Sequence, residues 1–337
     1  MAKRVGGYTV EFEKPIKITG YAAVAGQKES EGRFGSGFDK VVYDAKAGQA
    51  TWEQAESAFQ REALSLALEK SGCKAEELDF LFSGDLLNQC ISSTYGLKDF
   101  SVPYLGQYGA CSTMAQGLIM AAVMLEASAA RVCAAVTSSN FCAAERQYRF
   151  PLEYGGQRTP TAQWTVSAAG ACIVASEVKG KFPLITGATV GMITDLGITD
   201  ANNMGAAMAP AAAKTLLSYF SDTATIPSDY DAVYTGDLGV VGSELLRELM
   251  MREGVDISAV HRDCGEMIFD RERQDVHAGG SGCGCAASVL CGHILPSLCE
   301  GELHRVLFVA TGAMMSPTSC QQGQSIPSVA HLVRIEM

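Results

Sequence analysis

The stretch CSTMAQGLIMAAVMLEASAA, residues 111–130, decides how the rest of the chain is arranged. It carries a single charge, at Glu126, and is apolar on every side when drawn as a helix. A helix of this kind lies buried among other elements and not on a surface. The stretch therefore predicts a central helix that begins at Cys111.

The first turn of this predicted helix carries a thiol and two hydroxyls. Ser112 and Thr113 can bond the free amides of a first turn, and the positive end of the helix dipole favours an anion there. Cys111 is then expected to be biased toward thiolate, or to lie beside a pocket that accepts carboxylates. The alternative is plain packing, because cysteine is often buried and the chain has 12 of them.

Length and composition limit the classes of protein that fit. The 337 residues can bury a large core, and a net charge of -11 argues against non-specific nucleic-acid binding. The cysteines are scattered through apolar segments, unlike a secreted disulfide framework. Residues 1–4 give no sign of a signal peptide, and the most apolar run, residues 118–125, is too short for a transmembrane segment. We therefore expect reduced thiols and, at most, a peripheral membrane role.

Strands and helices are expected to alternate along the chain. The predicted strands are residues 15–25, 78–82, 131–137, 164–176, 184–190, 230–235, 305–311 and 329–335. The predicted helices are residues 51–71, 111–130, 211–220, 243–253 and 285–299, and a polar excursion spans 138–163. Such alternation is typical of a layered α/β fold.

The two halves of the chain resemble each other. ELDFLFSGDL at 77–86 parallels DYDAVYTGDL at 229–238, and residues 111–137 lie over residues 285–311 without a gap. We therefore predict two related α/β units, residues 1–180 and 181–337, each with one buried helix between the sheets. The loops that open these two helices then lie at related positions, which is a natural place for a pocket.

This duplicated pattern resembles the thiolase superfold, which implies a layered α-β-α-β-α arrangement of two pseudo-symmetric halves. A narrower resemblance, to the stage V sporulation protein AD family, rests on motifs spread over the whole chain. They are GDLLNQ 84–89, PYLG 103–106, GACST 109–113, AERQYRFP 144–151, EYGGQ 153–157, TGDLG 235–239, AGGSGCGC 278–285 and QQGQSIP 321–327.

The resemblance implies that catalysis has been lost. Condensing enzymes of the superfold use the cysteine together with His and Asn, or with two His, from the second half. The corresponding segments here, 235–239 and 279–282, contain neither residue type, and His277 only lies nearby in sequence. We therefore expect a non-catalytic binding protein. The alternatives are an acyltransferase or condensing enzyme similar to β-ketoacyl synthase III that uses Cys111 with His277, and a purely structural partner.

The ligand that the resemblance implies is dipicolinic acid (pyridine-2,6-dicarboxylic acid), alone or as its calcium chelate, moved into the developing spore and out at germination. Helix N-termini, amides and hydroxyls suit such a dianion. Arg146 and Arg149 either add charge to the site, or their segment, 144–151, only pairs with Glu145 or Glu153 or crosses a dimer interface. The expected ligand-binding residues are Cys111, Ser112, Thr113, Asn140 (where the family commonly has His), Asp237, His277, Gly279, Gly280 and Ser281.

The resemblance also implies partners and a location. We expect contacts with other subunits of the spore dipicolinate channel, a homodimer, and a peripheral place at the inner spore membrane. No cofactor is expected, and calcium is expected only as part of the ligand. Cys283 and Cys285 lack a fourth ligand with zinc-like spacing, and the glycines at 280, 282 and 284 lack the order of a nucleotide-binding loop.

Overall fold

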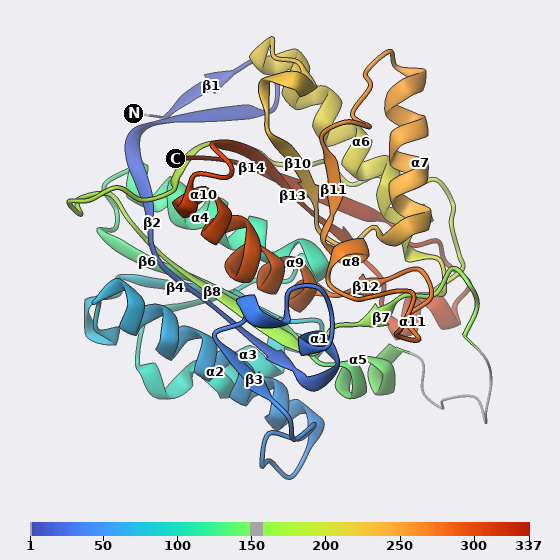
Figure 1. Cartoon of the computed structure of the whole chain (residues 1–337), viewed down its shortest axis with the longest axis horizontal. Coiled ribbons are helices and arrows are strands. Elements are labelled where there is room, and N and C mark those ends of the chain that lie inside the picture. Colours follow the sequence, from blue (N-terminus) through green and yellow to red (C-terminus); the bar gives the residue numbers. More distant parts are fainter. Residues whose placement is uncertain (1, 149–157) are drawn as a thin grey trace.

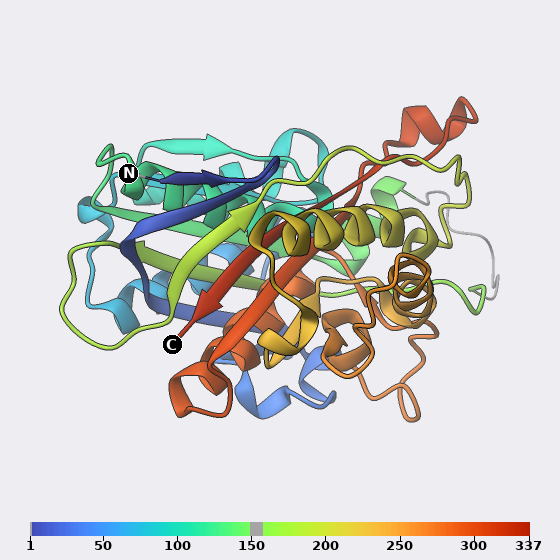
Figure 2. The ribbon, with the colours of Figure 1, turned by 90° about the horizontal axis from the view of Figure 1, so that it is seen from above.

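The computed structural model describes residues 2–148 and 158–337. The large mixed sheet consists of two series of strands. Helices cover the outer face of each series, and a further helical layer lies between the two series (Figure 1, Figure 2). Arg149, Glu153 and the motif at 153–157, which we singled out in the sequence, lie outside the described residues.

The strands of the first half form one series, β5-β4-β6-β8-β2. β4 is parallel to β5 and β6, whereas β8 is antiparallel to β6 and to β2. The bounds are β2 (Thr9–Gly26), β4 (Phe80–Gly84), β5 (Tyr104–Gly106), β6 (Val132–Ser139) and β8 (Ala168–Ala175).

The strands of the second half repeat this order and these directions as β11-β10-β13-β14-β9. β2 pairs antiparallel with β9 and so joins the two series, and the predicted division at residue 180 falls between β8 and β9. The bounds are β9 (Leu184–Thr189), β10 (Ala232–Thr235), β11 (His261–Asp263), β13 (Arg305–Ala313) and β14 (Ser328–Glu336).

Three small pairings complete the described strands. β1 (Lys3–Val5) and β3 (Lys40–Val42) pair with β2. β7 (Trp164–Thr165) pairs in parallel with β12 (Gly280–Ser281), and this short ladder ties the middle of the chain to the glycine-rich loop.

The outer helices cover the two series separately, α2 and α3 over the first and α6 and α7 over the second (Figure 1). Their bounds are α2 (Trp52–Ser71), α3 (Ile91–Leu97), α6 (Met204–Thr223) and α7 (Gly239–Arg252). The remaining short helices are α1 (Gln27–Ser30), α5 (Phe141–Tyr148), α8 (Cys264–Met267) and α11 (Pro317–Gln321).

The central layer holds the two predicted buried helices. α4 (Thr113–Glu126) follows a 3-10 turn at Ala110–Ser112, so the helix predicted at 111–130 is shorter at both ends. The helix predicted at 285–299 begins earlier, as α9 (Cys283–Val289), and reaches α10 (Leu295–Glu300) through a π-helical turn at Leu290–Ile294. Within the described residues, 283–300 is the one helical run long and apolar enough to cross a membrane, and 78% of that run is buried inside the fold.

Several sequence expectations need correction. The strand predicted at 164–176 is two strands, β7 and β8. β2 begins at Thr9, not at 15, because its first part pairs with β1 and β9 and its second part with β8. The strand predicted at 78–82 is β4, shifted by two residues toward the C-terminus. The polar excursion contains α5, whose N-cap is Asn140, with its side-chain oxygen accepting from the amide of Ala143 at 3.2 Å.

Candidate functional site

The openings of the two central helices meet at one small cavity. Cys111 from the first half and Ser281 from the second both line it, and its volume is about 40 Å³. No lysine, arginine or histidine of the described chain is among the lining residues. We call this space the thiol cavity; it is lined by Leu86, Tyr108, Ala110, Cys111, Ala144, Tyr148, Thr165, Met204, Ser281, Ala313 and Met315.

Asp237 is fully buried next to this cavity. Its carboxylate accepts hydrogen bonds from the glycine-rich loop and from β13. Its Oδ2 accepts from the Gly282 amide at 2.8 Å and from the Ser281 hydroxyl at 3.1 Å. Its Oδ1 accepts from the Thr311 hydroxyl at 2.8 Å. This carboxylate also acts on the thiol of Cys111, as a nearby negative charge and acceptor. Asp237 is therefore held in place and faces the sulfur.

This arrangement keeps the thiol protonated. Burial, then the negative charge of Asp237 and the neighbouring Cys283, raise the pKa of Cys111 well above its ordinary value. Burial also raises the pKa of Asp237, against the lowering effect of the hydrogen bonds that it accepts. A nucleophilic cysteine needs the opposite environment, since the thiolate is the reactive form. The thiolate that we expected from the helix dipole is thus wrong for Cys111.

The hydroxyls of Ser112 and Thr113, at the start of α4, donate to preceding carbonyls and do not cap the free amides of the first turn. Ser112 donates to the carbonyl of Gly109 at 2.6 Å, and Thr113 donates to the carbonyl of Ala110 at 2.7 Å. Ala110 has a φ of 47°, and this left-handed residue at the entry to the helix places both hydroxyls over the preceding carbonyls. Neither Ser112 nor Thr113 lines the cavity, so their predicted ligand role finds no support in the geometry.

The amides of the glycine-rich loop are likewise already bonded within the protein. The Gly279 amide donates to Val276, and the Gly282 amide donates to Asp237. The Gly284 amide donates to the hydroxyl of Ser139 at 3.1 Å. We expected this loop to bind the anion of a ligand. The anion that it binds is instead the carboxylate of Asp237. Gly280 contributes a backbone carbonyl, which accepts from Gln163 at 2.6 Å.

His277 and Asn140 are not brought to Cys111. The Nδ1 of His277 lies 2.7 Å from the carbonyl of Thr159, and its Nε2 lies 2.9 Å from Asp275. Asn140 lines a different and larger space on the other side of α5. Of the predicted residues, the structure thus groups Cys111, Asp237 and Ser281 and separates these two side chains from them.

Several residues at or beside the cavity were not among the predicted ligand residues. Cys283 packs with Cys111 in one apolar cluster and donates from its thiol to the carbonyl of Ser138 at 2.8 Å. The hydroxyls of Tyr108 and Tyr148 lie 2.8 Å apart at the cavity wall. The position of Cys283 in the motif at 278–285, two residues before the repeat-related Cys285, was the available signal. Tyr148 lies in the quoted motif at 144–151, whereas Tyr108 lies in none of the quoted motifs.

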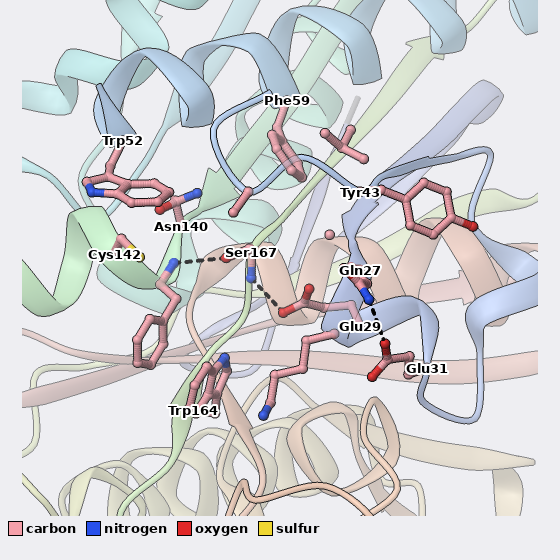
Figure 3. Close-up of a pocket in the computed structure, with 15 residues that line it drawn as sticks. Gln27, Glu29, Glu31, Tyr43, Trp52, Phe59, Asn140, Cys142, Trp164 and Ser167 are labelled. Atoms are coloured by element: carbon pink, nitrogen blue, oxygen red, sulfur yellow. Dashed lines mark hydrogen bonds between the residues drawn. The ribbon is translucent and has the colours of Figure 1, made fainter. Parts of the chain in front are cut away.

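The larger space behind α5 has a volume of about 370 Å³, and five aromatic side chains are among the residues that line it (Figure 3). β7 separates it from the thiol cavity, because successive strand residues face opposite sides and Trp164 lines this space whereas Thr165 lines the cavity. We call it the aromatic cleft; its lining residues include Gln27, Lys28, Glu29, Glu31, Tyr43, Trp52, Phe59, Asn140, Phe141, Cys142, Trp164 and Ser167.

Polar groups are placed among these rings. The ammonium of Lys28 lies 3.9 Å from the centroid of the Trp164 ring, whose plane stacks on Phe141 at the same centroid distance. Glu29 is buried and accepts from the amide of Ser167 at 2.9 Å, and burial raises its pKa to about 7. Glu31 also lines the cleft and accepts from Gln27 at 3.0 Å. The aromatic cleft therefore offers flat walls, one cation and two carboxyl groups.

The chain matches a family model over almost its whole length. Residues 6–336 match the model described as stage V sporulation protein AD. The curated stage V sporulation protein AD of Bacillus subtilis (strain 168) is 43% identical over 334 residues, which cover 99% of this chain and 98% of that protein. The chain belongs to the stage V sporulation protein AD family.

Solved structures show that this stage V sporulation protein AD family member has a thiolase-like fold. OleA of Xanthomonas campestris with cerulenin matches with a TM-score of 0.61 and 16% identity, covering 97% of this chain and 98% of that one. 3-Oxoacyl-[acyl-carrier-protein] synthase III from Aquifex aeolicus matches with a TM-score of 0.58 and 13% identity, covering 96% and 100%. At these identities the likeness shows the fold alone.

Two further expectations can be compared with the geometry of this family member. Arg146 pairs with Glu53 on α2, so its charge is not free for a ligand. Glu145 is buried, and the hydroxyl of Thr165 lies 3.4 Å from its carboxylate. Within residues 2–148 and 158–337, no group of three or more His, Cys, Asp or Glu side chains is arranged to hold a metal ion.

Proposed function

We propose that this protein is a non-catalytic small-molecule binding component of the machinery that takes dipicolinic acid into the spore and releases it. The observation that carries the proposal is the pairing of Cys111 with the buried carboxylate of Asp237. A carboxylate in this place raises the pKa of the thiol and cannot act as the cationic or neutral donor that an oxyanion needs. Membership of a sporulation protein family supports the biological setting.

The aromatic cleft suits dipicolinate better than the thiol cavity does. The cavity of about 40 Å³ has room for about three water molecules. The cleft of about 370 Å³ offers rings of Trp52, Phe59 and Trp164 to a flat pyridine ring. Lys28 and the amide of Asn140 can meet a carboxylate of the ligand. We therefore place the ligand in the cleft and treat Asn140 as the one predicted ligand residue that lies there.

The carboxyl groups of the cleft favour the calcium chelate over the free dianion. Glu29 and Glu31 would repel a dianion, whereas calcium takes six to eight oxygen ligands and dipicolinate occupies only some of them. Two carboxyl groups are too few for a resident metal site but can complete the shell of an ion that arrives with its chelator. Calcium is thus part of the ligand in this proposal.

The remaining parts of the proposal concern assembly. β5 ends the first strand series, and Tyr104, Leu105 and Tyr108 are 37%, 43% and 38% exposed beside this edge. An unpaired strand edge with apolar side chains is a template for pairing with a second copy. We propose a homodimer through β5 that binds channel subunits peripherally at the inner spore membrane. Sedimentation should show a dimer, and Leu105→Lys should shift it to monomer.

Calorimetry with dipicolinate, with and without calcium, tests the ligand. We expect stoichiometric heat that is larger with calcium and that is strongly reduced in Trp52→Leu and Lys28→Gln. Lys98→Gln, an exposed lysine remote from the cleft, is the matched control. Ser281→Tyr fills the thiol cavity and should leave the heat of binding unchanged. Loss of heat in that variant alone would show that the ligand binds in the thiol cavity and not in the aromatic cleft.

Mass spectrometry tests the absence of catalysis. Incubation with an acyl-CoA should leave the intact mass unchanged, because the thiol of Cys111 is protonated and buried. A stable acyl adduct on Cys111 that is followed by condensation would refute the non-catalytic proposal and favour an acyltransferase.

A further inference from the structure

A third space, on the second-half side of the molecule, is lined by arginines. It lies among the loop that follows α1, helices α7 and α8, and the edge strand β11 (Figure 1), and its volume is about 470 Å³. It shares no lining residue with the thiol cavity or the aromatic cleft. We call it the arginine cleft, after Arg33, Arg247, Arg262 and Arg271.

The positive charges of this cleft are not neutralised by ion pairs. Within the described chain, none of the four guanidinium groups forms a salt bridge, although the chain as a whole carries a charge of -11. The acidic residues that line the cleft are Asp263, Glu266 and Glu272. Asp263 is buried, and its oxygens accept from three backbone amides and one hydroxyl of the chain.

A chain of hydrogen bonds fixes Arg247 in the cleft. Arginine can only donate, so at 3.3 Å the Nδ1 of His261 must accept from the Arg247 guanidinium. The Nε2 of His261 then carries the proton and donates to the hydroxyl of Thr235 at 2.9 Å, which in turn donates to Asp263 at 2.6 Å. His261 is buried and neutral, since burial and the adjacent Arg247 and Arg262 lower its pKa to about 3. The imidazole thus orients Arg247 without cancelling its charge.

Two further guanidinium groups are held in the same way, by neutral acceptors. Arg262 donates to the carbonyl of His261 at 2.7 Å, and Arg271 donates to the carbonyl of His277 at 3.2 Å. Such contacts lower the entropy that these side chains lose when they bind a ligand. They also leave other donors of each planar group available for an oxyanion.

We propose that the arginine cleft is a binding site for a small doubly charged oxyanion, the chemistry shared by phosphate monoesters and dicarboxylates. Guanidinium groups recognise both by paired N–H donors. The four arginines outnumber the three lining carboxyl groups, and the carboxylate of Asp263 is already bonded by four donors within the chain. The site uses none of the residues placed around dipicolinate, which is itself a dicarboxylate, so Lys28→Gln and Arg247→Gln separate the two sites.

Calorimetry at low salt tests this site with inorganic phosphate and with malonate, at about pH 8 where phosphate is largely doubly charged. Binding should weaken roughly tenfold for each of Arg247→Gln and Arg262→Gln. Arg252→Gln, on the same helix but paired with Glu248, should bind like the wild type. Heat with phosphate identifies a site for phosphate groups, and heat with malonate identifies a site for dicarboxylates. Chloride should give no heat.

A second measurement uses the wild-type protein, so it does not depend on whether a variant folds. Phenylglyoxal modifies free guanidinium groups, and the bound anion should protect Arg247 and Arg262 but not Arg252 when the modified peptides are identified by mass spectrometry. Absence of heat with both anions together with no protection would overturn the proposal, as would equal weakening by Arg252→Gln. Lys28→Gln should leave this site intact, so its failure is distinguishable from failure of the dipicolinate proposal.

Discussion

Replacing Asp237 by Asn tests whether the buried carboxylate holds Cys111 in its thiol form. In the wild-type chain, burial is the largest cause of the raised pKa of Cys111, and Asp237 adds to it as a nearby negative charge and acceptor. Asn keeps the size of the side chain and one oxygen for the Gly282 amide. The substitution therefore removes the charge while leaving the burial unchanged.

The expected magnitude follows from the charged acceptor that is lost. A hydrogen bond to a charged acceptor contributes about 1.5–3 kcal/mol, against about 1 kcal/mol for a neutral one. The difference corresponds to a fall of about one unit in the pKa of the Cys111 thiol. Below its pKa the thiolate fraction rises tenfold per unit, so Cys111 should be alkylated about tenfold faster in Asp237→Asn. Because the Thr311 hydroxyl can rotate to accept from the new amide, we expect a fold that is destabilised by only about 1 kcal/mol.

The assay is the rate of iodoacetamide addition at Cys111, followed by peptide mass mapping so that the other thiols do not contribute. Asp85→Asn is the matched control, because Asp85 occupies the repeat-related position and bonds Leu87 and Ser93 instead of Cys111. The control should leave the rate at Cys111 unchanged. An unchanged or slower rate in a folded Asp237→Asn protein would refute the reasoning.

Three other variants probe the fold and its pH dependence. The pKa of buried Glu29 is raised to about 7, so the folded state holds its proton more tightly and stability falls as pH rises from about 4.5 to 7. Glu29→Gln should remove up to about 3 kcal/mol of that fall in urea titrations, and an unchanged pH profile would contradict this. The pKa of His331 is lowered to about 4 by burial, so its contribution is lost as pH falls from about 6.5 toward 4. His331→Gln should lessen that acid sensitivity in thermal melts, and equal sensitivity would count against it. A Cβ at Gly312 would lie 2.3 Å from the carbonyl of Gly109, so Gly312→Ala should cost about 1–3 kcal/mol in denaturant unfolding, and a neutral result would argue against so close an approach.

The fold was predictable where one pattern dominated. Residues 111–130 are apolar on every side, and the structure places the resulting helix between the two strand series. The first part of β2 was missed although a signal was present, because Val10 and Phe12 alternate with the charges at 11 and 13, which is the two-residue period of a half-buried strand. α5 had a signal in Asn140 as its N-cap and in its amphipathic pattern, but it is only eight residues long and lies within a stretch that is polar overall.

The site was less predictable than the fold, because its decisive contacts join distant parts of the chain. Residue types at 111–113 and 279–285 correctly indicated two helix openings, and the structure brings these openings to one cavity. Nothing near Gly282 indicates that its amide is bonded by Asp237, a residue 45 positions earlier. Likewise, the hydroxyls of Ser112 and Thr113 are consumed locally because of one left-handed residue, Ala110.

The contrast between Asp85 and Asp237 shows how two repeat-related carboxylates acquire different tasks. Asp85 accepts from the amide of Leu87, two residues on, and so closes the loop after β4. In the second half the loop after β10 is closed instead by Asp263, whose carboxylate accepts from the amides of Leu238 and Gly239. Because Asp263 closes this loop, the carboxylate of Asp237 is not needed for that contact. It lies instead at the opening of the first central helix, next to Cys111.

Asp263 also ends the hydrogen-bond chain that begins at Arg247 in the arginine cleft. The loop that presents Asp237 to the thiol is thus anchored by a carboxylate whose other contacts reach the second site. Any anion that moves Arg247 acts on His261 and Thr235 before it acts on Asp263, and a rotated Thr235 hydroxyl would leave Asp263 without one of its four donors. The alkylation rate of Cys111 should therefore respond to phosphate in the wild type and not in Arg247→Gln, which measures communication between the two sites directly.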